Sequence, residues 1–140
     1  MSDKLKLGMI LSGILLFCLI IAGVMFPIAV SAADPSAEAK AKEYYEISLA
    51  HFKKNNLNDA IEALNKAVNL DNTNFIYFYN LGTLYLKTKN YDFAIEKFMN
   101  TLKFNSNHQE SYYNLGLSYM YKNDYVKAAD YFNQAIALNQ

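Results

Sequence analysis

Tyr77–Phe98 reads YFYNLGTLYLKTKNYDFAIEKF, and a close copy of this stretch, SYYNLGLSYMYKNDYVKAADYF, occupies Ser111–Phe132. The two copies lie 34 residues apart and agree at small, aliphatic and aromatic positions. The matching pairs are Leu81 and Leu115, Gly82 and Gly116, Tyr85 and Tyr119, Tyr91 and Tyr125, Ala94 and Ala128, and Phe98 and Phe132. Self-similarity at a fixed period of this length is typical of a repeat architecture.

A weaker copy of the same pattern precedes these two. A further shift of 34 residues places on the same positions Ile47, Ser48, His51, Leu57, Ala60 and Leu64. This first copy keeps most of the apolar positions but lacks the Gly and the Tyr. The sequence therefore predicts three repeats, at about residues 41–74, 75–108 and 109–140.

Each copy contains two segments with apolar residues at helical spacing, separated by short polar stretches. Asp34 as N-cap and Pro35 as first helical residue are a favourable start for the first helix, and Asn56 or Asn58 is expected to cap the second. The predicted helices cover about residues 34–54, 58–70, 74–89, 91–104, 108–122 and 125–139. No strand pattern competes with them, so the predicted fold class is all-α.

Gly82 and Gly116 fall in the middle of predicted helices, where Gly is about 1 kcal/mol less favourable than Ala. Packing must compensate for this cost. The expected reason is a close approach of the second helix of the same repeat, on which Ala94 and Ala128 are small for the same purpose.

The pattern aromatic-x2-Leu-Gly-x2-Tyr, followed by Ala-x3-Phe on the next helix, resembles the tetratricopeptide repeat over about residues 41–140. The resemblance implies a right-handed superhelix of three stacked helix-turn-helix repeats, whose first helices line a concave groove that holds peptides or partner helices. The Pro expected between repeats is replaced by Asn72, Ser106 and Gln140, so the boundaries there are less sharply fixed.

The resemblance places the partner-binding groove on three positions of each first helix. These positions hold Tyr45, Leu49 and Phe52, then Tyr79, Thr83 and Leu86, then Tyr113, Leu117 and Met120. Because nearly all of them are apolar or aromatic, the expected partner is an apolar or amphipathic protein segment. The alternative is that these side chains pack on one another, or that the N-terminal segment of the chain fills the groove.

Chaperone-binding members of the family hold a C-terminal carboxylate with Lys and Arg beside Asn. At the matching positions this chain has Asn80 and Asn114, but it has Tyr45, Leu49 and Glu110 in place of the cations. An acidic peptide tail is therefore not the expected ligand.

Residues 7–30 are uncharged and mostly apolar, and they follow Lys4 and Lys6. The run exceeds the roughly 20 residues that a transmembrane helix needs. The small residues up to Ala32 and Ala33 equally suit cleavage of a secretory signal peptide. The sequence leaves both interpretations open.

Both interpretations divide the chain into residues 1–33 and a repeat domain at residues 34–140. The two Lys favour retention of the N-terminus inside, which places the domain across the cytoplasmic membrane, periplasmic or otherwise extracytoplasmic. In a eukaryotic source, the segment would instead anchor a cytosol-facing domain similar to an import receptor. The single cysteine, Cys18, lies in the apolar run, so the predicted domain is independent of redox conditions.

The composition gives no support to nucleic-acid binding or catalysis. The formal net charge is zero and the chain contains no Arg, so no basic field attracts nucleic acid. His51 is expected at a half-buried core position and His108 in a solvated turn, and no His or Cys pair has metal-site spacing. We therefore predict no enzyme activity, no catalytic residue, no metal and no cofactor.

The predicted function is a non-catalytic scaffold that binds a protein partner during assembly of a membrane or envelope complex. The alternative is a permanent structural subunit of a larger membrane or filament assembly. A second surface arises because no further helix follows the last predicted one to cover its apolar residues. The exposed positions Val126, Ala129, Ile136 and Leu138 would be covered by a partner subunit or by a second copy of the chain, and the alternative is a frayed end that the protein tolerates.

Overall fold

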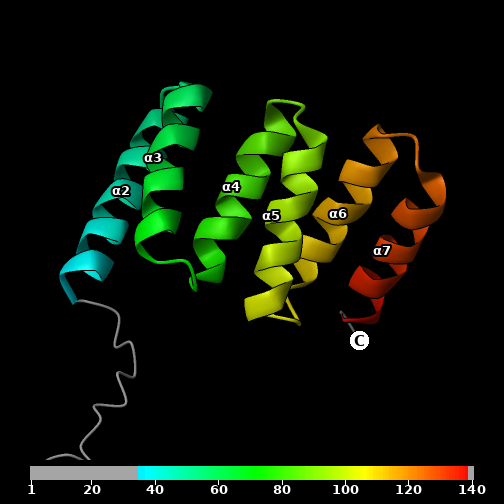
Figure 1. The fold of residues 1–140 in the computed structure, drawn as a ribbon. Coiled ribbons are helices and arrows are strands. Elements are labelled where there is room, and N and C mark those ends of the chain that lie inside the picture. Colours follow the sequence, from blue (N-terminus) through cyan, green and yellow to red (C-terminus); the bar gives the residue numbers. More distant parts are fainter. Residues whose placement is uncertain (1–34, 139–140) are drawn as a thin grey trace, which may run out of the picture. The chain divides into compact units, whose positions relative to one another are not determined.

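The computed structural model describes residues 35–138 of the chain. Figure 1 shows the six helices, which are α2 (Pro35–Lys53), α3 (Leu57–Leu70), α4 (Phe75–Lys87), α5 (Tyr91–Phe104), α6 (Gln109–Tyr121) and α7 (Tyr125–Ala137). No strand occurs in this part of the chain. The all-α fold predicted from the sequence is confirmed.

The predictions made for the N-terminus lie outside the described residues. They include the anchor or signal peptide at residues 7–30, its cleavage at Ala32 or Ala33, and the N-cap role of Asp34. Between residues 35 and 138, no helix combines the length and the apolar character that a membrane crossing requires. The domain boundary after residue 33 stays a prediction.

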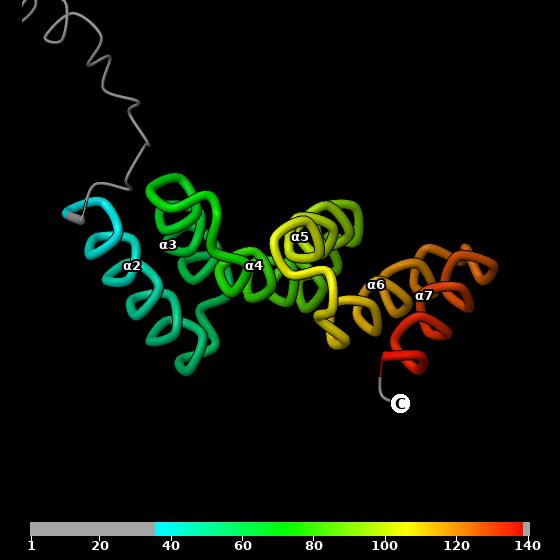
Figure 2. The backbone as a smooth tube through the Cα atoms, turned by 90° about the horizontal axis from the view of Figure 1, so that it is seen from below, coloured from blue at the N-terminus to red at the C-terminus, as the bar shows by residue number. Residues whose placement is uncertain are grey.

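The helices form three hairpins that follow one another in a row. Within the hairpins α2 packs on α3, α4 on α5 and α6 on α7, and neighbouring hairpins meet through α3 with α4 and α5 with α6. Figures 1 and 2 show this succession from two directions. Each hairpin contacts only its neighbours, which is the organisation of a repeat stack. The right-handed sense implied by the resemblance stays a prediction.

The first helix of each hairpin is followed by one residue in the left-handed backbone region. These residues are Asn55 with φ 61°, Lys89 with φ 62° and Asn123 with φ 62°. A helix cannot continue through a positive φ. The predicted helix end at residue 89 was therefore wrong, since α4 ends at Lys87, whereas the predicted end at residue 122 coincides with the C-cap of α6, Lys122.

Side-chain caps begin some of the helices but not all of them. Asn74 accepts a hydrogen bond from the backbone N–H of Ile76 at 3.1 Å, and Asp124 accepts from the backbone N–H of Lys127 at 3.2 Å. The hydrogen bond from the Lys127 ammonium, followed by this backbone bond, lowers the pKa of Asp124. Asn56 lies at the N-cap position of α3, but its side chain makes no capping bond, so its predicted role as a side-chain cap was wrong.

Aliphatic residues at equivalent repeat positions form the core. Leu81 and Leu115 are completely buried, as is Leu64 on α3. One cluster joins the first hairpin to α4 and contains Ala41, Ala60, Leu64, Ala67, Tyr77, Leu81 and Leu84. A second cluster joins the second hairpin to α6 and contains Ala94, Phe98 and Leu115. The core is thus continuous across the boundaries between hairpins.

The two helical glycines lie where a ring from the second helix of the same hairpin presses on the first. A Cβ added to Gly82 would lie 2.7 Å from Cε1 of Phe98, and one added to Gly116 would lie 2.6 Å from Cδ1 of Phe132. Both distances are shorter than any ordinary carbon–carbon contact. The close approach predicted from the sequence is confirmed at both positions.

Replacing each glycine by Ala tests how strictly the contact is needed. Phe98 is completely buried, so it cannot move away from a new methyl group at position 82. We expect Gly82→Ala to lower the free energy of unfolding by about 1–2 kcal/mol, because overpacking exceeds the gain in helix propensity. Phe132 is only half-buried, so we expect a loss below about 1 kcal/mol for Gly116→Ala.

Urea unfolding followed by far-ultraviolet circular dichroism measures both effects. The paired design controls for helix propensity, since the two substitutions are chemically the same. A Gly82→Ala variant as stable as the parent would show that the ring contact does not require glycine.

Candidate interaction groove

A repeated Tyr–Asn hydrogen bond joins the first helices of neighbouring hairpins. The Asn80 amide on α4 donates to the Tyr45 hydroxyl on α2 at 3.4 Å, and the Asn114 amide on α6 donates to the Tyr79 hydroxyl on α4 at 3.4 Å. Both amides are engaged between the repeats.

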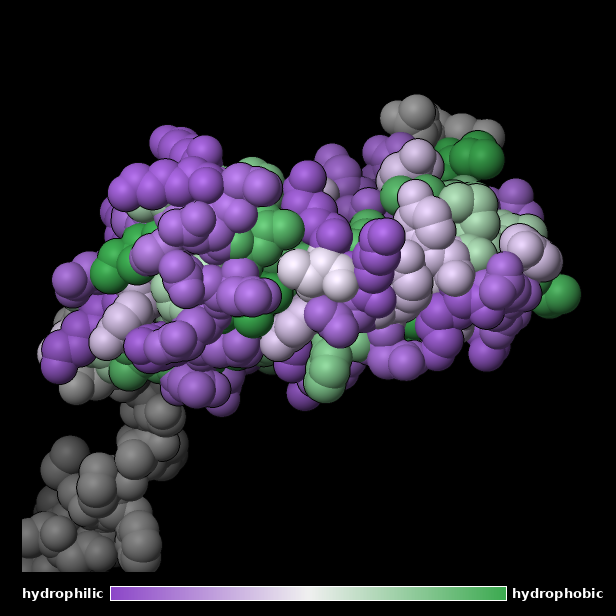
Figure 3. Space-filling view, turned by 90° about the horizontal axis from the view of Figure 1, so that it is seen from above, coloured by the Kyte–Doolittle hydropathy of each residue, from purple (hydrophilic) through white to green (hydrophobic). Residues whose placement is uncertain are grey.

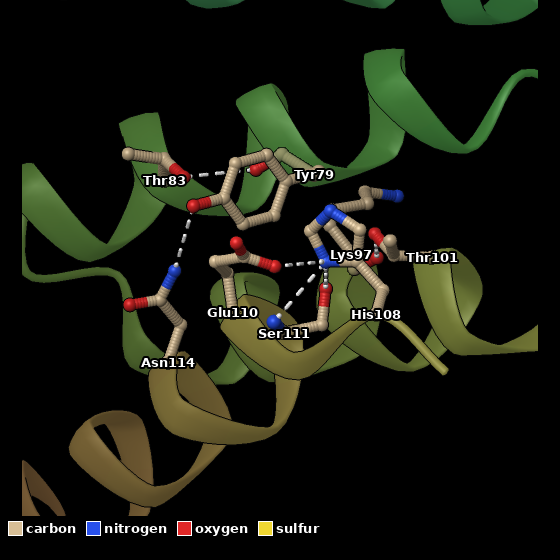
Figure 4. A network of polar contacts seen from close by, with 8 residues as sticks. All are labelled: Tyr79, Thr83, Lys97, Thr101, His108, Glu110, Ser111 and Asn114. Carbon is tan, nitrogen blue, oxygen red and sulfur yellow. Dashed lines mark hydrogen bonds and ion pairs between the residues drawn. The ribbon is translucent and has the colours of Figure 1, made fainter. Parts of the chain in front are cut away.

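His108 is a structural residue at the boundary between the second and third hairpins (Figure 4). It is the N-cap of α6, and its Nδ1 accepts the backbone N–H of Ser111 at 3.2 Å. Its ring centroid lies 4.7 Å from that of Tyr79 and 5.6 Å from that of Phe75. The expectation of a solvated His108 was wrong, because the side chain is only 17% exposed beneath the preceding hairpin.

The other hydroxyls around this boundary are also satisfied within the protein, as Figure 4 shows. Thr83 donates to the carbonyl oxygen of Tyr79 at 3.0 Å, and Thr101 donates to that of Lys97 at 3.0 Å. The Ser111 hydroxyl lies 2.9 Å from Nδ1 of His108. At this boundary the side chains are therefore packed on one another, and these hydroxyl groups already have hydrogen-bond partners within the protein.

A hollow of about 470 Å³ lies between the N-terminal halves of α2 and α4. Its lining is Glu38, Ala39, Lys42, Tyr45, Glu46, Asn74, Ile76 and Tyr77. Burial raises the pKa of the Tyr77 hydroxyl, and the nearby Asp71 carboxylate adds to this effect. The charged residues in this lining, Glu38, Lys42 and Glu46, all come from α2.

Two further hollows recur between the first helices, farther toward their C-terminal ends. The one between α2 and α4 measures about 120 Å³ and is lined by Ser48, Leu49, Phe52, Asn80, Thr83 and Leu84. The one between α4 and α6 measures about 320 Å³ and is lined by Leu86, Lys87, Lys89, Tyr91, Leu117 and Tyr121. The repeat thus places an apolar hollow at two successive hairpin boundaries.

The structure brings most of the predicted groove residues to these hollows. Tyr45, Leu49, Phe52, Thr83, Leu86 and Leu117 line them. Tyr79 instead packs against Phe98 and His108, so packing of groove side chains within the protein applies at this position. Tyr113 and Met120 on α6 are exposed at 51% and 36%.

Sequence comparison of the repeats did not identify every residue that lines the groove. Lys87 places its ammonium 5.4 Å from the centroid of the Phe52 ring, a cation–π distance across the boundary between α4 and α2. Tyr121 and Ile76 also line hollows. Tyr121 and Ile76 are apolar residues at helix positions next to the predicted groove positions, and this was the only indication in the sequence that they would line hollows.

Residues 35–138 show no grouping of three or more His, Cys, Asp or Glu side chains that would hold a metal ion. His51 is half-buried, as expected, and its Nδ1 lies 3.5 Å from the Asp59 carboxylate.

The structure is a stack of helical hairpins in which glycines allow close packing of the two helices, and hollows lie between the first helices. This is the architecture of an all-α repeat protein. A model of the TPR repeat family matches residues 49–89, and a model described as Tetratricopeptide repeat matches residues 110–140. The chain is a tetratricopeptide repeat protein. The two models cover two repeats, whereas the described residues contain three helix pairs. Families of this repeat are typically non-catalytic binding modules.

Solved structures share the fold. A crystal structure of MamA is 29% identical with a TM-score of 0.70, and the match covers 71% of this chain but only 58% of that one. The Arabidopsis OM64 TPR domain is 20% identical with a TM-score of 0.70, and the match covers 73% of this chain and 84% of that one.

The first TPR of Spaghetti (RPAP3), bound to the HSP90 peptide SRMEEVD, is 19% identical with a TM-score of 0.69. This match covers 72% of the present chain and 80% of the Spaghetti chain. At this identity the similarity shows the fold alone. No protein of curated function matches the sequence.

Substitutions at His108 separate its two structural roles. His108→Ala removes the cap and the ring contacts, and we expect it to lower the free energy of unfolding by about 2 kcal/mol. Asn74 caps α4 at the equivalent position, so His108→Asn should recover about 1 kcal/mol of that loss.

Thermal and urea unfolding measure the stabilities, and hydrogen exchange at the Ser111 amide reports the cap directly. Equal losses in the Ala and Asn variants would mean that the cap contributes nothing.

Proposed function

We propose that the chain is a protein-interaction scaffold whose groove binds an apolar or amphipathic segment of a partner protein. The observation that carries this proposal is the pair of hollows at successive hairpin boundaries, each lined by aliphatic and aromatic side chains together with polar or charged ones. Hollows repeated along a row of helices suit a ligand that inserts apolar side chains at regular intervals.

The lining of the groove favours this ligand over an acidic peptide tail. The Spaghetti relative is bound to the peptide SRMEEVD, which carries three carboxylate side chains. In the present chain, Tyr45, Leu49 and Glu110 occupy the positions where chaperone-binding relatives carry cations. The Asn80 and Asn114 amides, which would complete such a site, bond to tyrosines of the preceding hairpin.

The binding mechanism is capture on a preformed surface. The Tyr–Asn bonds and the continuous core fix the spacing of the first helices before a ligand arrives. A partner segment then desolvates apolar side chains such as Leu86, Leu117 and Phe52. A rigid groove loses little conformational entropy on binding, so more of the apolar contact appears as affinity.

The proposal includes a place of action at a membrane. The support is the uncharged run at residues 7–30, which would tether or export the repeat domain. A groove held near the membrane would recruit a partner into a membrane or envelope complex. In the alternative, the chain is a permanent structural subunit of such an assembly. Stoichiometry after mild detergent solubilisation distinguishes them, since a subunit co-purifies at a fixed ratio and an adaptor at a substoichiometric one.

A photo-reactive amino acid at Thr83 or Leu117 tests the groove in living cells. Both residues line hollows, so we expect each to cross-link a partner protein. Met99 on α5 is a matched control, because it is 46% exposed but lies on the second helix of its hairpin. We expect Leu86→Ala to reduce the cross-link at position 117 about tenfold, since it removes a central apolar contact.

Equal labelling from positions 83, 99 and 117 would contradict a specific groove. Circular dichroism of the Leu86→Ala variant shows whether the fold is intact, so that a loss of binding is not mistaken for unfolding.

A further inference from the structure

The boundary between the second and third hairpins shows what covers a repeat in this protein. Tyr91 on α5 stacks on Tyr121 of α6, with ring centroids 5.3 Å apart and planes 17° apart. Asp92 forms an ion pair with Lys122. His108 covers Tyr79, as described above. One ion pair and several apolar contacts therefore hold α6 on the preceding hairpin.

The equivalent face of the third hairpin is open within the described residues. Tyr113, Tyr125, Val126 and Ile136 stand 34 residues after Tyr79, Tyr91, Asp92 and Leu102. Their exposed fractions are 51%, 64%, 76% and 60%. A hollow of about 640 Å³ lies on this face and is lined by Gln109, Glu110, Tyr113, Phe132, Ala135 and Ile136. We call this surface of α6 and α7 the tail face.

The tail face differs in charge from the boundary it corresponds to, since Glu110 stands at the position of Ile76. Val126 replaces Asp92, so the acidic partner of the interrepeat ion pair is missing. Glu110 lies at the rim of the hollow, where its carboxylate is 3.7 Å from Nδ1 of His108. Figure 3 shows paler and green residues gathered toward the α6–α7 end, and hydrophilic residues over the α2–α3 end. Among the residues that line the hollow, Glu110 alone carries a charge.

The opposite end of the stack is built differently. Lys40, Glu43 and Glu46 on α2 stand at the positions of His108, Ser111 and Asn114 on α6, and all three are exposed. Ser111 is completely buried at its boundary. A copy stacked head-to-tail would have to bury the Glu43 carboxylate at that position, which is strongly unfavourable without a paired cation. The α2 end thus resembles a polar terminal cap.

We propose that two copies of the chain pair through their tail faces, related by a twofold axis. A twofold interface uses the same surface on both copies, so that surface must be compatible with itself. The tail face meets this condition, because its most exposed residues are Tyr113, Tyr125, Val126 and Ile136, and the one carboxylate in the lining of its hollow, that of Glu110, lies beside His108. The α2 end exposes charged residues and is therefore not complementary to the tail face. This pairing uses α7 and does not depend on a ligand in the groove.

Sedimentation velocity of the full chain in mild detergent measures the pairing. The parent protein should show a concentration-dependent monomer–dimer equilibrium. Ile136→Glu should raise the dissociation constant about a hundredfold, because a twofold dimer would carry the buried charge twice. Ile47→Glu is the matched control, since Ile47 is 38% exposed at the opposite end of the stack and its substitution should leave the dimer intact.

Cross-linking establishes the orientation. In a Cys18→Ser background, Ile136→Cys should give a dimer with a short bis-maleimide, and Ile47→Cys should not. A parent chain that stays monomeric at every concentration would overturn the proposal, as would capture of another protein by the tail face without dimer formation. Loss of the dimer in Ile47→Glu would indicate head-to-tail stacking and would overturn it too. Circular dichroism of Ile136→Glu shows that the variant is folded.

Discussion

The contact between a helical glycine and a phenylalanine ring is the constraint on which the stack depends. The ring of Phe98 lies where the Cβ of any other residue at position 82 would be. This approach sets how closely the two helices of a hairpin pack, and therefore where Leu81 meets the preceding hairpin. The same spacing places the first helices of neighbouring hairpins side by side, and together they form the inner face of the stack. Hydrogen bonds such as Asn80 to Tyr45 form only because the first helices are brought side by side.

The period of 34 residues was sufficient to predict the helices, their order and the close approach at Gly82 and Gly116. The helix ends were less predictable. Lys89 and Asn123 adopt a left-handed conformation, although one is Lys, a residue that rarely does so. The conformation is imposed by the turn into the next helix, since Asn55 occupies the same position in the first hairpin. Such a constraint comes from packing, so the local sequence predicts it only weakly.

Most of the residues predicted for the groove line the hollows, because repeat positions determine which face of a helix a residue occupies, while the binding of a partner there stays a prediction. The contacts within the groove were not predicted. His108 looked like a turn residue, yet the rings of Phe75 and Tyr79 cover it from the preceding hairpin. Tyr79 was expected to face a ligand and instead completes that same contact. Both differences come from contacts between residues of different hairpins, and helical periodicity alone does not predict which residues of two hairpins meet.

Tyr113 links the groove to the tail face. It is the third member of the tyrosine series that begins with Tyr45 and Tyr79, and it also lines the hollow on the tail face. In the first two hairpins, the tyrosine hydroxyl accepts an amide hydrogen bond from the following hairpin. Pairing through the tail face would cover Tyr113 in a comparable way and lengthen the row of first helices. The exposed ring of Tyr113 therefore belongs both to the series of tyrosines along the first helices and to the tail face.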